Sequence, residues 1–410
     1  MTKRLILAFV FLSWHLVACS NGDSGISSGL PDKPSAEEDS PGTETISEEM
    51  RVKITGEDLY ISAKLDAKTD ILYWFKKCMF NELFTFYRVG TIDNNMPAPA
   101  TLPDASPTSL LNLAYSDNIG PFNITGYGWC GGNHPYLDEV TQTARNIGYR
   151  IYIDGKEIKT DLSTLTKEIK IEVINEIMNP SKADTSSGKT LLNEILCIET
   201  VNYSIYRNNI QVLVTHEFQN ESPVTVQMYY GMQSMFDKET HTLTANGKYV
   251  DWTVQKDVST FTKKEYPSFR RFIEKSANVY QSSYLFADGL GNHEEISDDD
   301  IIFIGNSSNK TYHKIIADRE HKKGDIIHWS GVYTWFKSPV SDDDDLLCYE
   351  GVIDNKKVLF IDCKKNVDRT IQLPVDYTKK SFTIIEKSKS ITITGNKVTA
   401  KGCLLYTSDA

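Results

Sequence analysis

The chain has 410 residues, of which 40% are hydrophobic and 11% aromatic. That much aromatic surface offsets chain entropy only when it is packed, so a wholly disordered chain is excluded. The formal charge of −11 argues against a nucleic-acid partner, which needs a basic face to neutralise phosphates, and seven Cys are too few for a disulfide-built scaffold of this length.

Residues 1–18 have the pattern of an export signal. Lys3 and Arg4 supply the positive charge, and Leu5–Val17 supplies an apolar run shorter than the ~20 residues that cross a bilayer. The run ends in Leu-Val-Ala directly before Cys19, which resembles the lipobox of bacterial lipoproteins. The resemblance implies cleavage before Cys19 and lipid attachment to its sulfur, so that Cys19 becomes a membrane anchor. The alternative is an ordinary secretory signal followed by a chance cysteine.

Residues 19–49 are predicted to form a disordered tether. The segment is rich in Ser, Gly, Pro and acidic residues and cannot bury a core. An acidic leader after a lipidated cysteine is similar to exported lipoproteins of Bacteroidetes, whose surface lipoproteins often handle glycans. This resemblance implies a protein of the cell envelope, anchored to the outer membrane on its periplasmic or its surface side, with a glycan or oligosaccharide as partner.

From residue 50 onward the chain consists mostly of short alternating runs bounded by turn residues. This pattern predicts an all-β fold, a large antiparallel β-sandwich with one or two short helices. Residues 50–340 form the predicted sandwich domain, and 341–402 add strands to the same domain or to a small second one. Residues 403–410 resemble the translation of a sequencing-library adapter and are left out of the fold prediction.

A glycine-rich segment at residues 128–136 is the strongest candidate for a binding loop. Glycines permit positive φ and close backbone approach, so the loop can present side chains on a rigid surface. Aromatic rings stack on the C–H faces of sugars, while amides and guanidinium groups bind hydroxyls. The predicted glycan contacts are Trp129, Asn133, His134, Tyr136 and Arg145. The alternative is a β-turn whose aromatic side chains fold back into the core.

Two segments are predicted to be short helices. Ser163–Ile169 fits one or two helical turns, in competition with a strand that starts at Ile169. Tyr266–Tyr280 has Pro267 near its start and apolar residues at helical spacing.

The clearest hairpin is predicted at Cys197–Phe218. A loop at Asn208-Asn209 would pair Val201 with His216 and place Glu199 diagonally to that histidine on the buried face. A buried carboxylate beside an imidazole makes an acid/base pair, so Glu199 and His216 are the catalytic candidates. The alternative is a core histidine satisfied by one hydrogen bond and a glutamate that reaches solvent.

Residues 212–236 loosely resemble galactose-mutarotase-like β-supersandwich proteins. The resemblance lies in a strand, the turn Asn220-Glu221-Ser222-Pro223, a second strand and an aromatic-rich end, with Asn133-His134 as a second element. It implies a fold suited to carbohydrates and a catalytic histidine at the end of the second strand. Gln233 stands near that place instead, so only His134 is carried over. The resulting alternatives to a glycan-binding protein are a carbohydrate-active enzyme (epimerase, lyase or hydrolase) and a structural or adhesive surface protein.

Three acidic clusters, Asp288–Glu295, Asp298–Asp300 and Asp342–Asp345, offer oxygen ligands of the kind that Ca²⁺ prefers. They lack the alternating spacing of calcium loops, so solvated loops are favoured over Ca²⁺ sites, and neither a metal nor a cofactor is predicted.

A second hairpin is predicted at Leu346–Cys363. With Asn355-Lys356 as its loop, Cys348 would lie opposite Cys363, within disulfide range. Two reduced buried thiols are the alternative.

Overall fold

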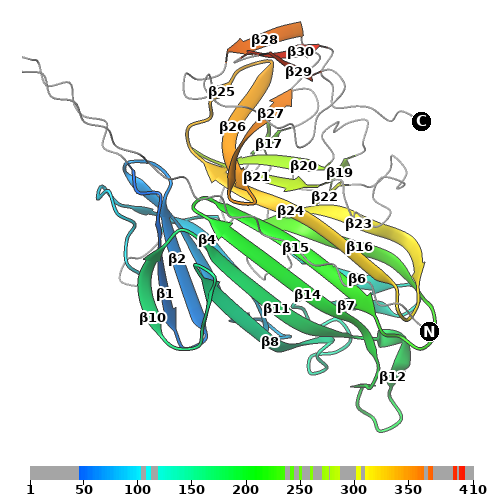
Figure 1. Ribbon diagram of the computed structural model, residues 1–410. Helices are drawn as coiled ribbons and strands as arrows, with labels where there is room; N and C mark the ends of the chain where they lie inside the picture. Colours follow the sequence, from blue (N-terminus) through cyan, green and yellow to red (C-terminus); the bar gives the residue numbers. More distant parts are fainter. Residues whose placement is uncertain are drawn as a thin grey trace, which may run out of the picture. The chain divides into compact units, whose positions relative to one another are not determined.

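Strands make up nearly all of the regular structure in the computed structural model (Figure 1). The structure describes residues 46–102, 108–111, 119–235, 241–243, 249–251, 259–261, 270–276, 278–286, 302–305, 310–363, 368–372, 391–394 and 397–401, all within the unit Glu44–Ala410. Within these ranges the helical structure is one 3₁₀ turn, Pro180–Lys182, and no helix is long and apolar enough to cross a membrane.

Several predictions concern segments outside the described residues. They are the export signal, Cys19, the tether up to residue 45, the acidic clusters Asp288–Glu295 and Asp298–Asp300, and residues 403–410.

Three large antiparallel sheets carry the fold. Sheet A has the order β10 (Leu162–Thr166), β1 (Met50–Thr55), β2 (Asp58–Lys64), β3 (Thr69–Cys78), β4 (Leu83–Asp93), β5 (Thr108–Leu111). Sheet B has the order β19 (Ser259–Phe261), β22 (Ile302–Gly305), β23 (Lys310–His321), β16 (Val224–Met235), β6 (Pro121–Ile124), β7 (Gly128–Gly131). Sheet C has the order β18 (Tyr249–Asp251), β17 (His241–Leu243), β20 (Arg271–Ser276), β21 (Val279–Leu285), β24 (Ile326–Phe336), β15 (Asn209–Phe218), β14 (Ile195–Tyr206), β11 (Ile169–Met178), β8 (Ala144–Ile153), β9 (Lys156–Ile158).

Three small sheets complete the described strands. They pair β12 (Ala183–Asp184) with β13 (Leu191–Leu192), β25 (Ser341–Asp342) with β26 (Leu346–Ile353) and β27 (Lys356–Cys363), and β28 (Asp368–Gln372) with β30 (Lys397–Lys401) and β29 (Ile391–Thr394).

One face of sheet C packs against both sheet A and sheet B. Tyr203 of β14 meets Phe75 and Phe86 of sheet A, with ring centroids 5.4 and 5.9 Å apart. Phe122 of sheet B meets Phe218 of β15 at 6.1 Å. Apolar residues alternate along these strands, so one side of each strand enters a common core and the other does not. The prediction of an all-β sandwich is confirmed.

The opposite face of sheet C carries the hairpin β26–β27. Tyr349 stacks on Phe336 of β24, with centroids 4.4 Å apart, and its hydroxyl lies 2.6 Å from that of Ser282. Strands on both sides therefore bury this end of sheet C.

The hairpin β14–β15 forms as predicted, but its register differs by two residues. The loop is Arg207-Asn208, with Arg207 at φ 51°, so Val201 pairs with Val214 and Glu199 pairs directly with His216. A slip of two leaves every side chain on the same face, so the apolar pattern cannot distinguish the two registers. Asn209 is not a loop residue because its buried amide accepts hydrogen bonds from Thr334 Oγ1 and Val352 N.

The hairpin β26–β27 shows the same shift. Its loop is Asp354-Asn355, both at positive φ, so Cys348 lies opposite Ile361 and Cys363 lies opposite Leu346. The prediction that Cys348 faces Cys363 across the hairpin was wrong, and the register no longer supports a disulfide between them.

Neither predicted helix is present in the part of the chain that the structure describes. Residues 162–166 form β10, which completes sheet A by pairing with β1, and Ile169 starts β11. Residues 271–276 form β20, and 279–280 belong to β21, whereas 266–269 lie outside the described residues. Phe272 and Ile273 are both fully buried although they are neighbours, because β20 has packed layers on both faces. A strand buried on both sides carries a continuous apolar run, which imitated helical spacing.

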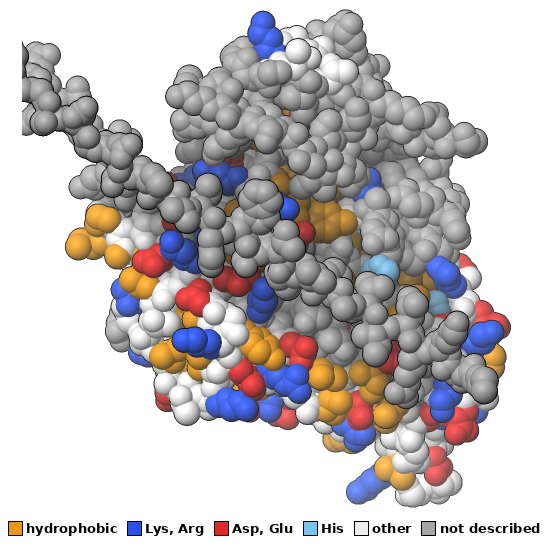
Figure 2. All heavy atoms as spheres, in the orientation of Figure 1, with side chains coloured by type: hydrophobic (Ala, Val, Ile, Leu, Met, Phe, Trp, Pro, Cys, Tyr) orange, Lys and Arg blue, Asp and Glu red, His pale blue; other side chains and the backbone are white. Residues whose placement is uncertain are grey.

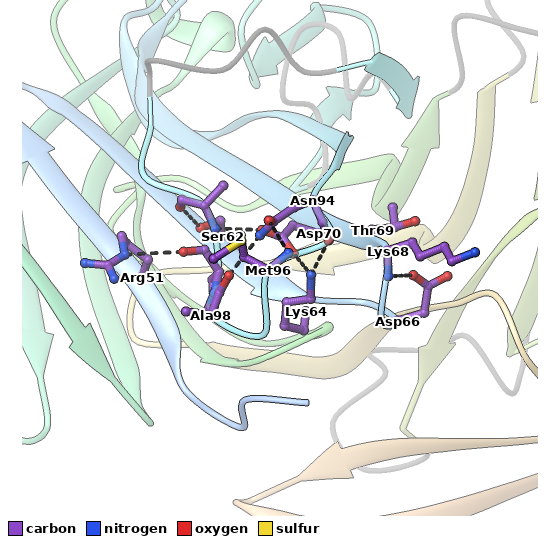
Figure 3. A network of polar contacts seen from close by, with 12 residues as sticks. Arg51, Ser62, Lys64, Asp66, Lys68, Thr69, Asp70, Asn94, Met96 and Ala98 are labelled. Carbon is purple, nitrogen blue, oxygen red and sulfur yellow. Dashed lines mark hydrogen bonds and ion pairs between the residues drawn. The ribbon is translucent and has the colours of Figure 1, made fainter. Parts of the chain in front are cut away.

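A fully buried ion pair fixes a loop of sheet A (Figure 3). Lys64 Nζ lies 2.8 Å from Asp70 Oδ1 and donates to the Asn94 carbonyl at 2.6 Å. Asp70 Oδ2 accepts from Asn94 Nδ2 and from Ala100 N, both at 2.7 Å. Because these buried charges find partners within the network, the pair serves to hold residues 94–100 in place.

Candidate functional site

Three half-buried aromatic rings form a row on sheet B. Trp129 lies on the edge strand β7, Tyr230 on β16 and Tyr136 in the loop after β7. The ring centroid of Trp129 is 5.8 Å from that of Tyr230 and 6.2 Å from that of Tyr136, with ring planes 21° and 30° apart. We call these three rings the aromatic shelf.

The shelf lies on the side of sheet B that faces away from sheet C. Cys130 and Tyr229, the strand neighbours of Trp129 and Tyr230, are fully buried, and Tyr229 touches His216 of sheet C. Side chains alternate between the two faces of a strand, so Trp129 and Tyr230 point outward. Their centroids are farther apart than those of a face-to-face pair such as Phe84 and Tyr149, at 3.9 Å, so the shelf rings are offset from one another.

The loop that carries Tyr136 is held from below by Asn81. This buried side chain donates to the Gly132 carbonyl at 2.7 Å and accepts from Thr143 N at 3.1 Å. Asn81 sits in the β3–β4 turn, where Met79 and Glu82 both have positive φ. Strained backbone of this kind persists where the surroundings fix it, so the turn is a rigid support for the loop.

Asp138 stiffens the outer part of the same loop. Its carboxylate accepts hydrogen bonds from Val140 N at 2.9 Å, from Thr141 Oγ1 at 2.8 Å and from Thr141 N at 2.6 Å, and these bonds lower the pKa of Asp138 to about 2. The Thr141 hydroxyl also lies 3.3 Å from the Thr190 carbonyl, which brings the loop against the segment before β13. The shelf is therefore preorganised rather than carried on a free loop.

Three of the five predicted glycan contacts lie together. Trp129 and Tyr136 belong to the shelf, and the half-buried His134 meets Tyr136 with centroids 5.7 Å apart and planes 64° apart. The predicted exposure of Asn133 was wrong, since its side chain is 1% exposed and its Oδ1 accepts from Leu83 N. The backbone of this residue turns inward after Gly131 and Gly132, both at positive φ.

Arg145 does not join the shelf. It lies on the outer face of sheet C, next to the buried Ala144, and forms an ion pair with Glu176 of β11. The core between sheets B and C separates it from Trp129. The expectation that Arg145 acts with the aromatic residues was wrong because strand alternation sends it to the other side.

Sequence reasoning missed Tyr230 as a site residue. Its signal was the aromatic run after residue 228, but its place beside Trp129 depends on the pairing of β16 with β6 and of β6 with β7. Residues Tyr229 and Phe122 pair there across a separation of more than a hundred positions, which local pattern cannot reveal.

Glu199 and His216 touch inside the sandwich. Glu199 Oε2 lies 2.9 Å from His216 Nε2, and Glu199 Oε1 accepts from Asn175 Nδ2 at 2.9 Å. Asn146 Nδ2 donates to Asn175 Oδ1, also at 2.9 Å, so a polar row crosses four neighbouring strands of sheet C.

The Glu199–His216 pair is closed off from solvent. The two residues are 2% and 0% exposed, and the rings of Phe122 and Tyr229 meet His216 edge-on. A group that performs acid/base catalysis must reach its substrate. The geometry therefore supports the alternative of a core histidine with one hydrogen bond, although Glu199 is buried and does not reach solvent as that alternative expected. The catalytic role stays a prediction.

A second buried carboxyl lies toward the other end of sheet C. Glu274 of β20 accepts from Thr311 Oγ1 at 2.8 Å and from Gln281 Nε2 at 3.4 Å, and Gln281 accepts from Trp335 Nε1. Burial raises the pKa of Glu274 to about 8, so the carboxyl keeps its proton at neutral pH. The sequence pattern did not reveal Glu274 because it assigned this segment to a helix.

Within the described residues, no group of three His, Cys, Asp or Glu side chains is placed to hold a metal ion. On the face in Figure 2, acidic and basic side chains intermingle over the described surface rather than forming a basic stripe of the kind that binds nucleic acid.

Comparisons with known proteins assign no family. No protein-family model and no curated protein matches the chain. Among solved structures, it is similar to the GH36 alpha-galactosidase AgaB from Geobacillus stearothermophilus, with a TM-score of 0.39 and 8% identity over 70% of this chain and 41% of that one. A variant of the GH36 alpha-galactosidase AgaA from the same organism gives a TM-score of 0.35, with 9% identity over 70% of this chain and 40% of that one.

A polysaccharide lyase gives a TM-score of 0.27, with 7% identity over 80% of this chain and 42% of that one. The chain thus spans about two fifths of the length of the three structures. At these TM-scores the similarities carry no argument about this chain.

Proposed function

We propose that this chain is a lipid-anchored envelope protein whose β-sandwich binds glycan at the aromatic shelf. The observation that carries the proposal is the row of three offset, half-buried rings on a preorganised surface. Aromatic faces bind the C–H faces of sugars, and a rigid loop loses little entropy when it binds.

Affinity electrophoresis tests the glycan proposal. Native gels containing xylan, mannan, β-glucan or starch should retard the wild-type protein in at least one case. Trp129→Ala removes the central ring of the shelf and should abolish the retardation. Tyr152→Ala is the matched control, because Tyr152 is a half-buried aromatic residue on the outer face of sheet C.

The control should migrate like the wild type in every gel, and both variants should keep the wild-type circular dichroism spectrum. Failure of every polysaccharide to retard the wild type, or equal retardation of wild type and Trp129→Ala, would contradict the proposal.

The anchor is the second part of the proposal. Its support is the lipobox-like sequence that ends at Cys19 and the acidic segment that follows it. Mass spectrometry of the membrane fraction should find an acylated N-terminal Cys19, and Cys19→Ala should move the protein to the soluble fraction. An unmodified chain that starts at Met1 would refute the anchor and leave glycan binding to be judged by the gels.

A further inference from the structure

The outer face of sheet A carries basic and aromatic side chains in a line across four strands. Lys53 of β1 pairs with Tyr60 of β2, which pairs with Trp74 of β3. Trp74 in turn pairs with Arg88 of β4. Residues paired across antiparallel strands point to the same face, so these four half-buried side chains are neighbours. Phe75, which follows Trp74 along β3, is fully buried in the core on the other face.

Lys76 adds a cation held between two aromatic rings. Its Nζ lies 4.4 Å from the ring centroid of Trp74 and 4.1 Å from that of Tyr87. The guanidinium carbon of Arg88 lies 5.8 Å from the same Tyr87 centroid. Two positive charges therefore lie close to a single ring. Ring faces attract cations but carry no formal charge, so the mutual repulsion of the two cations persists.

The cations of this face lack acidic partners. Lys53, Lys76 and Arg88 form no ion pair with any described carboxylate. Asp58 lies on the same face, but its Oδ1 accepts a hydrogen bond from Trp74 Nε1 at 2.8 Å. The Nε atom of Arg88 is buried and has no hydrogen-bond partner among the described residues. A buried donor without a partner is costly, so this guanidinium has binding capacity that the described chain does not use.

These features suit a small anion attached to a sugar ring. An oxyanion near Lys76 and Arg88 would compensate both charges, and a guanidinium binds a planar carboxylate through two parallel hydrogen bonds. Beside them, the rings of Tyr60 and Trp74 lie 5.4 Å apart with planes 27° from parallel. Aromatic side chains contact the C–H faces of sugars. The net charge of −11 disfavours an extended polyanion, whereas one acidic sugar interacts with charges within a Debye length of about 10 Å.

We propose that the outer face of sheet A binds a sugar that carries a carboxylate, such as a uronic acid. The carboxylate lies at Lys76 and Arg88, and the sugar ring lies against Tyr60 and Trp74. This site is on a different sheet from the aromatic shelf, and neither site depends on the other.

Isothermal titration at pH 7 with trigalacturonate and with its fully methyl-esterified form tests the proposal. The two probes have the same sugar rings and differ in charge. The wild-type protein should bind the acid at least about tenfold more tightly than the ester, and added salt should weaken binding of the acid. Equal affinities, or no binding of the acid, would overturn the proposal without the need for any variant.

Substitutions locate the anion. Lys76→Met keeps an apolar stem against the rings but removes the charge, and Arg88→Gln removes the guanidinium. Each should weaken binding of trigalacturonate by about tenfold or more. Lys76→Arg keeps the charge and should retain most of the affinity. Arg150→Gln is the matched control, because it removes one positive charge from the exposed outer face of sheet C.

The control should bind trigalacturonate like the wild type, and every variant should keep the wild-type circular dichroism spectrum. Wild-type affinity in both Lys76→Met and Arg88→Gln, or an equal loss in Arg150→Gln, would overturn the assignment of the anion to this face.

Three competitors test the class of ligand. Acetate, a thymidine oligonucleotide and vesicles with anionic lipid should each bind more weakly than trigalacturonate. Equal or tighter binding of any one of them would overturn the assignment of an acidic sugar.

Competition with a neutral polysaccharide separates this site from the aromatic shelf. A polysaccharide that retards the protein in native gels should not displace trigalacturonate. Displacement would place the acidic sugar at the shelf and overturn the proposal. If no neutral polysaccharide binds, the proposed function fails at the shelf, and the acidic-sugar site is judged by the titrations alone.

Discussion

Gly120 has no room for a side chain. A Cβ atom placed there would stand 1.6 Å from the carbonyl oxygen of Tyr230, and its φ is +83°. Gly120→Ala should force the backbone of Tyr230 to move and should lower the free energy of unfolding by about 3 kcal/mol or more. Urea denaturation measures the loss.

Gly126→Ala is the matched control for this contact. Its φ is +80°, but no atom lies within 4 Å of the position a Cβ would take, so only backbone strain of about 1 kcal/mol should appear. Equal losses of unfolding free energy in the two variants would show that the close approach of Gly120 to the Tyr230 carbonyl does not constrain the shelf.

Because the pKa of Glu274 is raised, the stability of the folded protein should fall as pH rises. Burial raises its pKa from 4.5 to about 8, so between these values the folded state holds a proton that the unfolded state has released. The free energy of unfolding should therefore fall through this window by at most about 1.4 kcal/mol per pH unit, and the contribution should level off above pH 8.

Glu274→Gln removes this titration and should flatten the corresponding part of the pH profile. Tyr333 also interacts electrostatically with Glu274, but burial raises its pKa well above the ordinary value and out of the window. Urea denaturation of both proteins from pH 5 to 9 gives the difference. Parallel profiles would mean that the carboxyl is ionised in the folded protein at neutral pH.

At the scale of elements, the two hairpin loops distinguish the predicted register from the observed one. In β26–β27 the loop residues Asp354 and Asn355 have φ of 49° and 57°. Asn355→Gly would create the preferred pair for such a turn and should stabilise the protein by about 0.5–1 kcal/mol. Thermal unfolding measures this change.

Lys356→Gly is expected to lower the stability of the protein rather than raise it. Lys356 is the first residue of β27, so glycine there should cost about 0.5–1 kcal/mol. In the predicted register Lys356 would be a loop residue and the same change would be favourable. A stabilising Lys356→Gly would therefore contradict the observed loop.

The sequence predicted where the strands lie better than it predicted which residues and strands pair with one another. Asp154-Gly155 marks the observed β8–β9 turn, with both residues at positive φ, because this dipeptide favours that turn strongly. Asn208-Asn209 gave a weaker signal, and a buried hydrogen-bonding role for Asn209 decided the loop. Trp129, His134 and Tyr136 were found from local composition, whereas Tyr230 and Asn81 depend on contacts between distant elements.

At the scale of the molecule, the fold class follows from alternation but the arrangement of sheets does not. Sheet C shares one face between sheets A and B, and its central strand β15 pairs with β24 more than a hundred residues later. Such pairings are set by burial of complementary faces, which a single sequence does not expose. The same long-range pairing places the aromatic shelf on one side of the core and Arg145 on the other.

A crystal structure with the tightest-binding neutral oligosaccharide is the most direct test of the central claim. The account predicts a sugar ring lying against the aromatic shelf at Trp129, with hydroxyl contacts to the surrounding loop. A sugar bound elsewhere, such as beside Glu274 or Glu199, with the shelf rings bare would contradict it.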